Sequence, residues 1–417
     1  MSSANIILST PTKNLTGTIN LTGSKSESNR ALMMQALSNG KVKPQNLSEA
    51  ADTLTLKHIL NSTDTTLNVG PAGTAMRFLT AFHTLQTTNV LLTGSARMKQ
   101  RPIGILVDAL RQLGAQITYV ENEGYPPLKI KGPLQQISNQ VHIRGDMSSQ
   151  YISALLLIAP SLPLGLRLHI TSELTSTPYI EMTLALLEQA GIQYTWENQI
   201  IHIAHQPFHA CTIAVEPDWS AASYWYAMAI LADEAEFFLP GLRPYSLQGD
   251  SKITEIMANF GITSEFKDRG VLLKKEPKIL KRKIFDFKEC PDLAQTVIVC
   301  CAALGHDATF TGLETLKIKE TNRIQALQNE LAKLGVKLIE QKNVYRLDCH
   351  ALHFPDTIYI NTYDDHRMAM AFAPLIFKIK EVEIENSHVV EKSYPHFWDD
   401  LAHITSLTQT ISQEYGL

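Results

Sequence analysis

A helix-like run that ends at a glycine and leads into a strand of alternating polarity recurs four times along the chain. The glycines are Gly114, Gly191, Gly261 and Gly335, so successive copies lie 77, 70 and 74 residues apart. Each glycine suits the left-handed conformation that follows a helix. A unit of roughly 70 residues is too long for a solenoid repeat and would fit this chain about six times. The spacing predicts an α/β fold that uses one small unit repeatedly, although helix–glycine–strand is common enough for coincidence to stay open.

Size and composition indicate an ordinary globular protein. The chain has 417 residues, of which 44% are hydrophobic and 19% charged, enough for two or three domains. A net charge of −4 argues against a nucleic-acid-coating surface, so a cationic site must be local. No run approaches the roughly 18 apolar residues of a membrane helix. The first residues lack a signal-peptide pattern, so we expect a cytoplasmic protein with neither nucleic-acid nor membrane partners.

Neither cysteine nor histidine predicts a structural bond or a metal site. The five cysteines form no CxxC pair and their number is odd, which disfavours a disulfide framework. Two histidine pairs, His202 with His205 and His350 with His353, lie in strand-like segments. A spacing of three places strand side chains on opposite faces, so we expect no metal at either pair.

The segment Leu21–Arg30 joins a strand-like run to a helix-like run. Its glycine permits a tight turn, and Ser26 and Ser28 can cap the new helix, whose free N–H groups favour an anion. Lys25 and Arg30 flank the turn. The glycine spacing differs from that of a Walker A loop. The segment predicts a site for a phosphorylated, carboxylated small molecule, and an ordinary capped helix remains the alternative.

Further segments place a turn beside a helix start, most of them with a basic residue. They are Asn68–Arg77, Arg97–Gly104, Asp146–Gln150, Lys317–Arg323, Asp364–Phe372 and Glu391–Phe397. On one helix, Lys319 and Arg323 would share a face and repel unless an anion lay between them. Glu320 and Arg323 are alternatively a surface ion pair. Together the segments predict a cationic cleft in an otherwise acidic protein.

A domain boundary is predicted near Pro217. The proline interrupts a strand just before the helix-like run Ser220–Ala229. Each of the two resulting lobes would hold about three of the repeated units. A cleft between the lobes is the expected ligand site.

Along nearly its whole length the chain resembles the 5-enolpyruvylshikimate-3-phosphate synthase (3-phosphoshikimate 1-carboxyvinyltransferase) family of enolpyruvyl transferases. The matching segments are Gly23–Arg30, Ala72–Arg77, Arg97–Gly104, Ser148–Gln150, Ser176–Tyr179, Pro291–Asp292, Lys319–Arg323, Asp365–Met370 and Lys392–Pro395. Their order and spacing follow the family. The resemblance implies a two-lobed inside-out α/β barrel with three βαβαββ units per lobe. One lobe would be residues 24–216, on the shikimate 3-phosphate side. The other would combine 1–23 with 217–417, on the phosphoenolpyruvate side, with the active site in the cleft between them.

The resemblance also implies a reaction. The family transfers the enolpyruvyl group of phosphoenolpyruvate to the 5-hydroxyl of shikimate 3-phosphate, through a tetrahedral ketal, and releases phosphate. This is a step of the shikimate pathway toward chorismate and aromatic amino acids, and the family is the target of glyphosate. It needs no metal or organic cofactor, and its members are mostly monomers, as we expect here. The two substrates carry roughly −5 to −6 charges, which matched cations would balance, and without ligand these cations would repel one another.

The matching positions imply the site residues. Shikimate 3-phosphate would be held by Lys25, Ser26, Arg30, Ser148, Ser149, Gln150, Ser176, Tyr179, Asp292, Thr315 and Lys319. Phosphoenolpyruvate would be held by Lys25, Gly73, Arg101, Gln150, Arg323, Arg367 and Lys392. The catalytic group would be Asp292, Glu320, Lys25 and His366. Within it, Asp292 would be the base at the 5-hydroxyl, Glu320 would move the proton of the methylene carbon, and His366 would orient its neighbours.

Four positions depart from the family pattern. Pro71 replaces an asparagine and Phe78 a proline beside the phosphoenolpyruvate pocket, where glyphosate also binds, so we expect altered glyphosate sensitivity. Thr315 replaces an asparagine that contacts shikimate 3-phosphate, and Asn322 replaces an aspartate. These changes leave the seven matched cations and both carboxylates in place.

Three alternatives remain. The sister enzyme that acts on UDP-N-acetylglucosamine has a different first turn, where this chain reads Gly-Ser-Lys-Ser, and carries a cysteine loop, whereas here the first cysteine is Cys211. A repeat-built DNA clamp is disfavoured by the net charge. A binding-only homologue of the family is the third.

Overall fold

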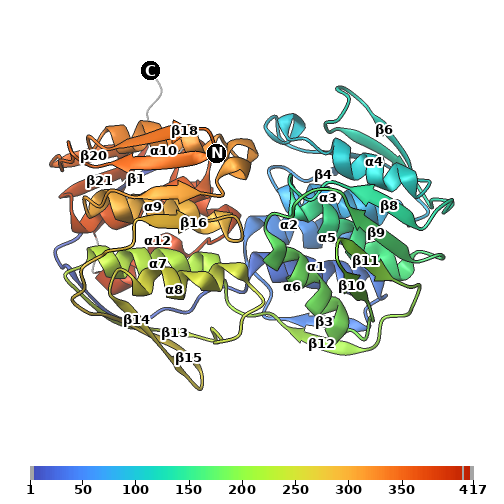
Figure 1. The fold of residues 1–417 in the computed structure, drawn as a ribbon, viewed down its shortest axis with the longest axis horizontal. Helices are drawn as coiled ribbons and strands as arrows, with labels where there is room; N and C mark the ends of the chain where they lie inside the picture. Colours follow the sequence, from blue (N-terminus) through green and yellow to red (C-terminus); the bar gives the residue numbers. More distant parts are fainter. Residues whose placement is uncertain (1–3, 406–407, 414–417) are drawn as a thin grey trace. The chain divides into compact units, whose positions relative to one another are not determined.

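The computed structural model describes residues 4–405 and 408–413. The chain divides into two compact units (Figure 1). One is the Gly23–Val215 unit; the other, called here the terminal unit, joins Met1–Thr22 to Glu216–Leu417. Both mix helices and strands, so the predicted α/β class is confirmed. In the described residues, no helix has the length and apolar character that a membrane crossing requires.

Six helices and ten strands form the Gly23–Val215 unit. The helices are α1 (Lys25–Leu37), α2 (Ala51–Leu60), α3 (Gly73–His83), α4 (Gly104–Gln112), α5 (Ser149–Ile158) and α6 (Thr177–Gln189). The strands are β3 (Val42–Gln45), β4 (Thr66–Asn68), β5 (Asn89–Thr93), β6 (Gln116–Tyr119), β7 (Leu128–Lys131), β8 (Gln140–Ile143), β9 (Leu166–Ile170), β10 (Thr195–Glu197), β11 (Ile200–Ile203) and β12 (Cys211–Ala214). Helices α1, α3 and α5 pack against one another.

The terminal unit has a similar inventory. Its helices are α7 (Trp219–Leu231), α8 (Ile253–Ala258), α9 (Ala294–Ala303), α10 (Arg323–Ala332), α11 (His366–Phe372) and α12 (Phe397–Thr405). Its described strands are β1 (Ala4–Ser9), β2 (Asn14–Thr18), β13 (Glu234–Pro240), β14 (Ile262–Lys267), β15 (Gly270–Lys275), β16 (Ile284–Asp286), β17 (Thr309–Thr311), β18 (Lys337–Gln341), β19 (Val344–Asp348), β20 (Thr357–Ile360), β21 (Glu381–Ile384) and β22 (Thr408–Gln413).

Three helices of the terminal unit, α7, α9 and α11, pack against one another at its core. Every residue of α9 and α11 is buried, and nearly every residue of α7. A helix that is apolar around its whole circumference belongs in a protein interior. Polar groups on these helices are therefore held in place by dense packing.

One pairing pattern recurs in five four-stranded sheets. In the order β4-β5-β7-β6, the first pair is parallel and the next two pairs are antiparallel. The sheets β8-β9-β11-β10, β2-β13-β15-β14, β16-β17-β19-β18 and β20-β21-β1-β22 repeat it. Strands β3 and β12 form one further parallel pair. The repetition agrees with a small unit used several times.

The four glycines of the repeat have the backbone that the sequence predicts. Gly114, Gly191, Gly261 and Gly335 all have positive φ. Each follows a helix and precedes β6, β10, β14 or β18, the strand that ends its sheet. A Cβ atom on Gly335 would lie 2.1 Å from the carbonyl oxygen of Ala351. Conformation and close approach both require glycine there.

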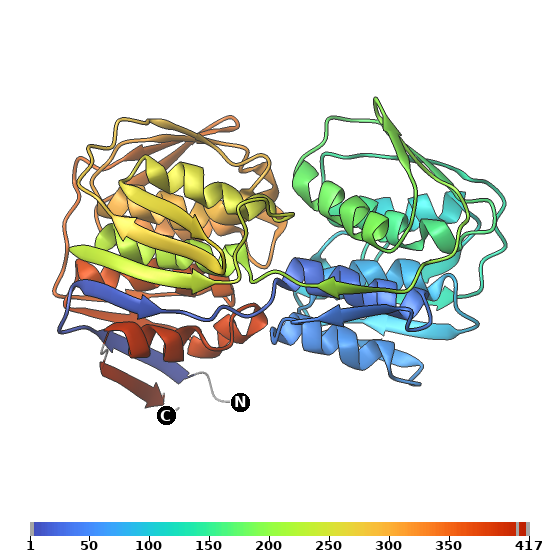
Figure 2. The ribbon, with the colours of Figure 1, turned by 90° about the horizontal axis from the view of Figure 1, so that it is seen from below.

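The amino-terminal strands belong to the terminal unit, as Figure 2 shows in blue. Strand β1 lies between β21 and β22 and is antiparallel to both. Strand β2 pairs in parallel with β13. The terminal unit therefore needs chain segments from both ends of the sequence.

The start of α1 differs from its prediction. The cap is Ser24, whose side chain accepts a hydrogen bond from the N–H of Glu27 at 3.4 Å. Ser26 and Ser28 lie within the first turn instead. The preceding Gly23 lies so close to another segment that a Cβ atom on it would be 2.0 Å from the carbonyl oxygen of Asn46. This contact fixes the turn at Gly23, so the helix begins at Lys25, before the predicted caps Ser26 and Ser28.

Candidate active site

Arg323 is the centre of a buried ionic cluster in the terminal unit. Its Nε donates to Oδ2 of Asp365 at 2.7 Å, its Nη1 to Oδ1 of Asp292 at 3.1 Å and its Nη2 to Oε2 of Glu320 at 2.9 Å. Only 1% of the residue is exposed. Although burial opposes its charge, the three carboxylates raise the pKa of Arg323 above its ordinary value. This guanidinium stays charged despite its burial.

A second guanidinium, that of Arg367, reaches the same carboxylate from α11. Its Nη2 donates to Oδ2 of Asp292 at 2.9 Å and to Oγ of Ser220 at 3.3 Å. Its Nη1 donates to the hydroxyl of Tyr224 at 3.2 Å. Burial raises the pKa of Tyr224 to about 12, so it remains a neutral partner. Arg367 is thus oriented by two elements, α7 and the 3₁₀ helix Pro291–Leu293 that holds Asp292.

The carboxylate of Asp292 lies between the two arginines, one on each oxygen. Burial raises its pKa, but Arg367, Lys319 and Arg323 outweigh burial and hold the pKa well below its usual range. Such a carboxylate is fully ionised and accepts a proton weakly. Anions that drew on the same cations would raise its proton affinity.

Lys319 and Arg323 do not lie on one helix, as the sequence spacing had suggested. The helix begins at Arg323, with Asn322 as its cap, accepting from the N–H of Gln325 at 3.3 Å. Lys319 follows the 3₁₀ helix Glu314–Ile318 instead, so the predicted shared face is wrong. Glu320 and Arg323 do form an ion pair, but it is not a surface pair, because the side chain of Arg323 is buried.

Two further expected residues border the cluster. Lys392 is buried, with Nζ 3.9 Å from Oε1 of Glu320. His366 is 1% exposed, and its Nδ1 lies 3.6 Å from Oδ1 of Asp365. Thr315 lies in the 3₁₀ helix before Lys319, and no hydrogen bond within the described residues joins it to the cluster.

The cluster carries its own counter-charges. Its four cations are Lys319, Arg323, Arg367 and Lys392. Its four carboxyl groups are Asp250, Asp292, Glu320 and Asp365. Carboxylates therefore lie beside these cations, although Arg367 still opposes the charge of Arg323 as the expected repulsion requires.

In the Gly23–Val215 unit, Arg30 is buried among neutral acceptors. Its Nε donates to Thr183 at 2.7 Å and its Nη2 to Ser153 at 3.0 Å. The carbonyls of Ser26 and Tyr179 accept from Nη1 and Nη2 at 2.9 and 3.1 Å. Burial lowers the pKa of Arg30 to about 10, so it is still a cation at neutral pH.

Aromatic and acidic neighbours complete this second cluster. The ring centroid of Phe78 lies 5.5 Å from Cζ of Arg30, within the range of a cation–π contact. Lys25 pairs with the buried Asp52 of α2, Nζ to Oδ2, at 3.3 Å. Phe78, where the family usually has proline, therefore contacts a predicted site cation.

The start of α5 lies close to that of α3. Ser148 caps α5 by accepting from the N–H of Gln150, and the amide of Gln150 donates to the hydroxyl of Thr74 at 3.2 Å. A Cβ atom on Gly73 would lie 2.6 Å from Nη1 of Arg101. Glycine at this position leaves room for the guanidinium.

Two other predicted ligands lie at helix starts. Ser149 is buried in the first turn of α5. Ser176 is the residue before α6, with a left-handed φ of 58°. Backbone strain of this kind is typical of functional sites.

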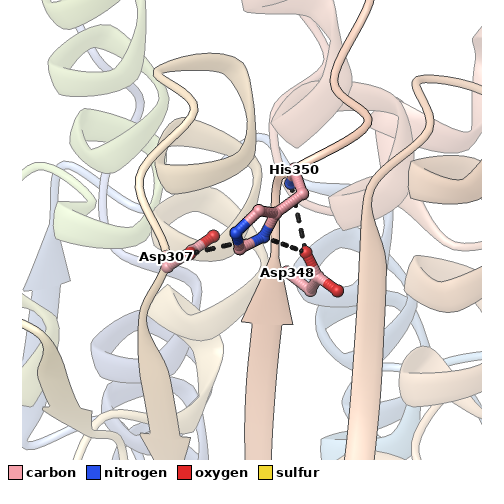
Figure 3. A group of neighbouring side chains, drawn as sticks. All are labelled: Asp307, Asp348 and His350. Atoms are coloured by element: carbon pink, nitrogen blue, oxygen red, sulfur yellow. Dashed lines mark hydrogen bonds and ion pairs between the residues drawn. The ribbon is translucent and has the colours of Figure 1, made fainter.

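A third group of titratable residues, Asp307, Asp348 and His350, is drawn in Figure 3. His350 Nδ1 lies 2.8 Å from Oδ1 of Asp348 and 3.9 Å from Oδ2 of Asp307. The hydrogen bond to Asp348 raises the pKa of His350. The expectation of a strand at His350 and His353 is wrong, because β19 ends at Asp348. The histidine is 84% exposed, and we assign the group as a surface ion pair.

Sequence reasoning missed several residues of these clusters. The motif Asp365–Met370 does not by itself indicate that Asp365 pairs with Arg323, although an aspartate before a helix start is a recognisable cap signal. Nothing in the sequence links Ser220 or Tyr224 to Arg367, or Asp52 to Lys25. Those contacts depend on the tertiary arrangement alone.

The comparisons with known proteins agree with the motif resemblance. The family model described as EPSP synthase (3-phosphoshikimate 1-carboxyvinyltransferase) matches residues 9–62 and 55–401. A 3-phosphoshikimate 1-carboxyvinyltransferase of Bacteroides fragilis is 46% identical over 397 residues, covering 95% of this chain and 96% of the relative. One of a Sulfurovum species is 36% identical, covering 96% and 100%.

Solved structures show the same fold. An EPSP synthase from Acinetobacter baumannii has a TM-score of 0.79 at 20% identity, covering 98% of this chain and 100% of that one. The enolpyruvyl transferase NikO from Streptomyces tendae has a TM-score of 0.74 at 14% identity, covering 99% and 100%. The chain belongs to the EPSP synthase (3-phosphoshikimate 1-carboxyvinyltransferase) family.

Proposed function

We propose that this enzyme transfers the enolpyruvyl group of phosphoenolpyruvate to the 5-hydroxyl of shikimate 3-phosphate and releases phosphate, within the shikimate pathway. The names of its relatives support the reaction. The observation that carries the proposal is the carboxylate of Asp292, held between the guanidinium groups of Arg323 and Arg367. This arrangement combines a base with cations suited to a phosphate and a carboxylate.

The reaction needs two proton transfers. The 5-hydroxyl must lose a proton as its oxygen attacks C2 of phosphoenolpyruvate, and the methylene carbon must gain one. Asp292 serves the first transfer. Its low pKa makes it a weak base while it pairs only with cations, and bound substrate anions would draw on Arg323 and Arg367 and raise that pKa. Glu320, which contacts Arg323 and Lys392, serves the second.

The remaining roles divide between the units. Shikimate 3-phosphate binds Lys25, Ser26, Arg30, Ser148, Ser149, Gln150, Ser176, Tyr179, Asp292, Thr315 and Lys319. Phosphoenolpyruvate binds Lys25, Gly73, Arg101, Gln150, Arg323, Arg367 and Lys392. His366 orients its neighbours. The chemistry is acid–base and electrostatic, and the proposal includes no metal or organic cofactor.

We also propose the finer architecture that the family resemblance implies. The two compact units would be the two lobes of an inside-out α/β barrel, with boundaries near Gly23 and Glu216. The recurring sheet pattern and the buried helices α1, α3, α5, α7, α9 and α11 support it. A monomer and a cytoplasmic location stay predictions from the sequence.

A phosphate-release assay with alternative acceptors tests the function. Phosphate should be released from phosphoenolpyruvate in the presence of shikimate 3-phosphate but not in the presence of UDP-N-acetylglucosamine. The family model and the relatives are named for the transfer to shikimate 3-phosphate. Release with UDP-N-acetylglucosamine alone would reverse the assignment. Binding of both family substrates without release would identify a binding-only homologue.

A further inference from the structure

Asp250 is a buried carboxyl group to which the proposed mechanism gives no role. It lies on the 3₁₀ helix Gly249–Lys252 and is 3% exposed. Its Oδ2 accepts a hydrogen bond from the hydroxyl of Ser220. Its Oδ1 has no hydrogen-bond partner among the residues that the structure describes. A buried carboxylate needs several donors to remain ionised without cost, so the charged form of Asp250 is poorly compensated.

Ser220 connects this carboxyl group to the site. Its hydroxyl donates to Asp250 and accepts from Nη2 of Arg367 at 3.3 Å. The same Nη2 donates to Asp292 at 2.9 Å. Asp250 is therefore joined to a predicted phosphoenolpyruvate ligand through a single hydroxyl group.

The charges around Asp250 are unequal. The groups facing it are Arg367 on α11, Asp292 ahead of α9, Asp218 at the start of α7 and the thiol of Cys290, with exposed Lys252 on its own element. Burial and Asp292 raise the pKa of Asp250 to about 7, against the opposite effects of Arg367 and Ser220. Burial raises the pKa of Cys290 to about 12, so its thiol is neutral. Arg367 is the cation that most favours ionised Asp250.

We propose that Asp250 is a positioning residue of the anion site, and that it takes a proton from solvent when an anion binds at Arg367. The anion draws on the positive charge that otherwise stabilises the carboxylate, so the carboxylate becomes more basic. One O–H bond forms on Asp250 and no other bond changes. Once Asp250 is neutral, it no longer competes with the ligand for electrostatic attraction to Arg367. The inference rests on the proposed role of Arg367 in binding phosphoenolpyruvate.

Sulfate is a suitable probe because it does not titrate near neutral pH. Calorimetric titration of the full chain with sulfate, in two buffers of different ionisation enthalpy, counts the protons taken up. At about pH 7 the wild type should take up a substantial fraction of one proton, and its sulfate affinity should fall by up to tenfold per pH unit above that. In Asp250→Asn, which keeps the side chain's shape, this uptake should disappear and the affinity should change much less with pH.

Two serine variants sharpen the test. Ser220→Ala removes the donor to Oδ2 of Asp250, which should move the proton uptake to higher pH. Ser223→Ala is the matched control, because Ser223 lies one turn along α7 and donates to the carbonyl of Ser220 at 2.7 Å; it should behave like the wild type. If Asp250→Asn does not fold, the shift of proton uptake to higher pH in Ser220→Ala tests the inference on its own.

Equal proton uptake in wild type and Asp250→Asn, or an unshifted profile in Ser220→Ala, would overturn the inference, as would a wild type that binds no sulfate. Turnover of the wild type with both substrates is measured separately. Proton-linked sulfate binding without turnover would contradict only the proposed function. Turnover with proton-independent sulfate binding would contradict only the role of Asp250.

Discussion

At the scale of single residues, the bridging position of Asp292 leads to a specific kinetic expectation. Asp292→Asn should lower kcat by about 10²- to 10⁴-fold, the usual contribution of a general acid or base. The KM for phosphoenolpyruvate should not rise, because losing the carboxylate leaves Arg323 and Arg367 more positive. Steady-state kinetics with both substrates measure this. Exposed Asp286 in β16 provides the control Asp286→Asn, and a kcat near that of the wild type in Asp292→Asn would refute the assignment.

Glu320 should behave in a similar way for the other proton transfer. Glu320→Gln should keep substrate binding and lose most turnover, because the amide still accepts the hydrogen bond of Arg323 but cannot exchange a proton. Binding of shikimate 3-phosphate by calorimetry and single-turnover kinetics separate the two effects. Near-normal turnover would remove Glu320 from the chemistry.

Phe78 is a residue where this chain departs from its family. Phe78→Leu removes the ring beside Arg30, and a cation–π contact of about 0.5–2 kcal/mol corresponds to a rise of about 2- to 30-fold in the KM for shikimate 3-phosphate. The matched control is Phe82→Leu, one turn along α3, where stability should fall without the same change in KM. Unchanged KM in Phe78→Leu would show that the ring only fills space.

At the scale of secondary-structure elements, the glycines after the helices matter unequally. Gly335→Ala places a Cβ atom 2.1 Å from a backbone oxygen, whereas in Gly305→Ala the nearest atom is a flexible leucine carbon at 3.3 Å. Both glycines have positive φ, 75° and 65°, so each substitution costs about 1–2 kcal/mol for conformation. Gly335→Ala should lower the free energy of unfolding by roughly 2 kcal/mol more. Equal losses in denaturant titrations would contradict the role given to the close approach.

The turn after β19 should add a pH-dependent contribution to stability. The raised pKa of His350 means that the folded protein binds its proton more tightly than the unfolded chain. The stabilisation is therefore complete below the ordinary histidine pKa of about 6.5 and is lost as pH rises through the folded value. Denaturation midpoints of wild type and His350→Gln should differ more at about pH 5.5 than at about pH 8.5, and added salt should shrink the difference. A difference independent of pH would contradict this ion pair.

Elements also show what the sequence can predict and what it cannot. Periodicity and glycine caps identified the recurring helix–glycine–strand unit, since both are local properties of the chain. The motifs identified the family and drew attention to Arg323 and Arg367. Glu320 lies three residues from Arg323, so that ion pair is local, and Asp365 lies in the same motif as Arg367. The position of Asp292 between the two arginines and the approach of Asp250 depend on the tertiary arrangement, because both residues belong to other segments. The sequence predicted Ser26 or Ser28 as the cap of α1, whereas the cap is Ser24. The position of this turn depends on the close packing of Gly23 against Asn46, a contact with another segment that no local pattern reveals.

At the scale of the whole molecule, the terminal unit is built from both ends of the chain. Ile7→Pro removes a hydrogen-bond donor from β1, which lies between β21 and β22, and proline is strongly disfavoured in the middle of a sheet. Hydrogen exchange should then lose protection in β20 and β21, and the strands β8 and β9 of the Gly23–Val215 unit serve as an internal control. Equal loss in both units would contradict two separate folding units.

The enolpyruvyl transfer itself is tested by following the fate of carbon-13-labelled phosphoenolpyruvate by NMR in the presence of shikimate 3-phosphate and the enzyme. We expect the label to appear as an enol ether on the 5-oxygen of shikimate 3-phosphate, with one phosphate released for each label transferred. Label that remains in phosphoenolpyruvate, or that appears only in pyruvate, would contradict it.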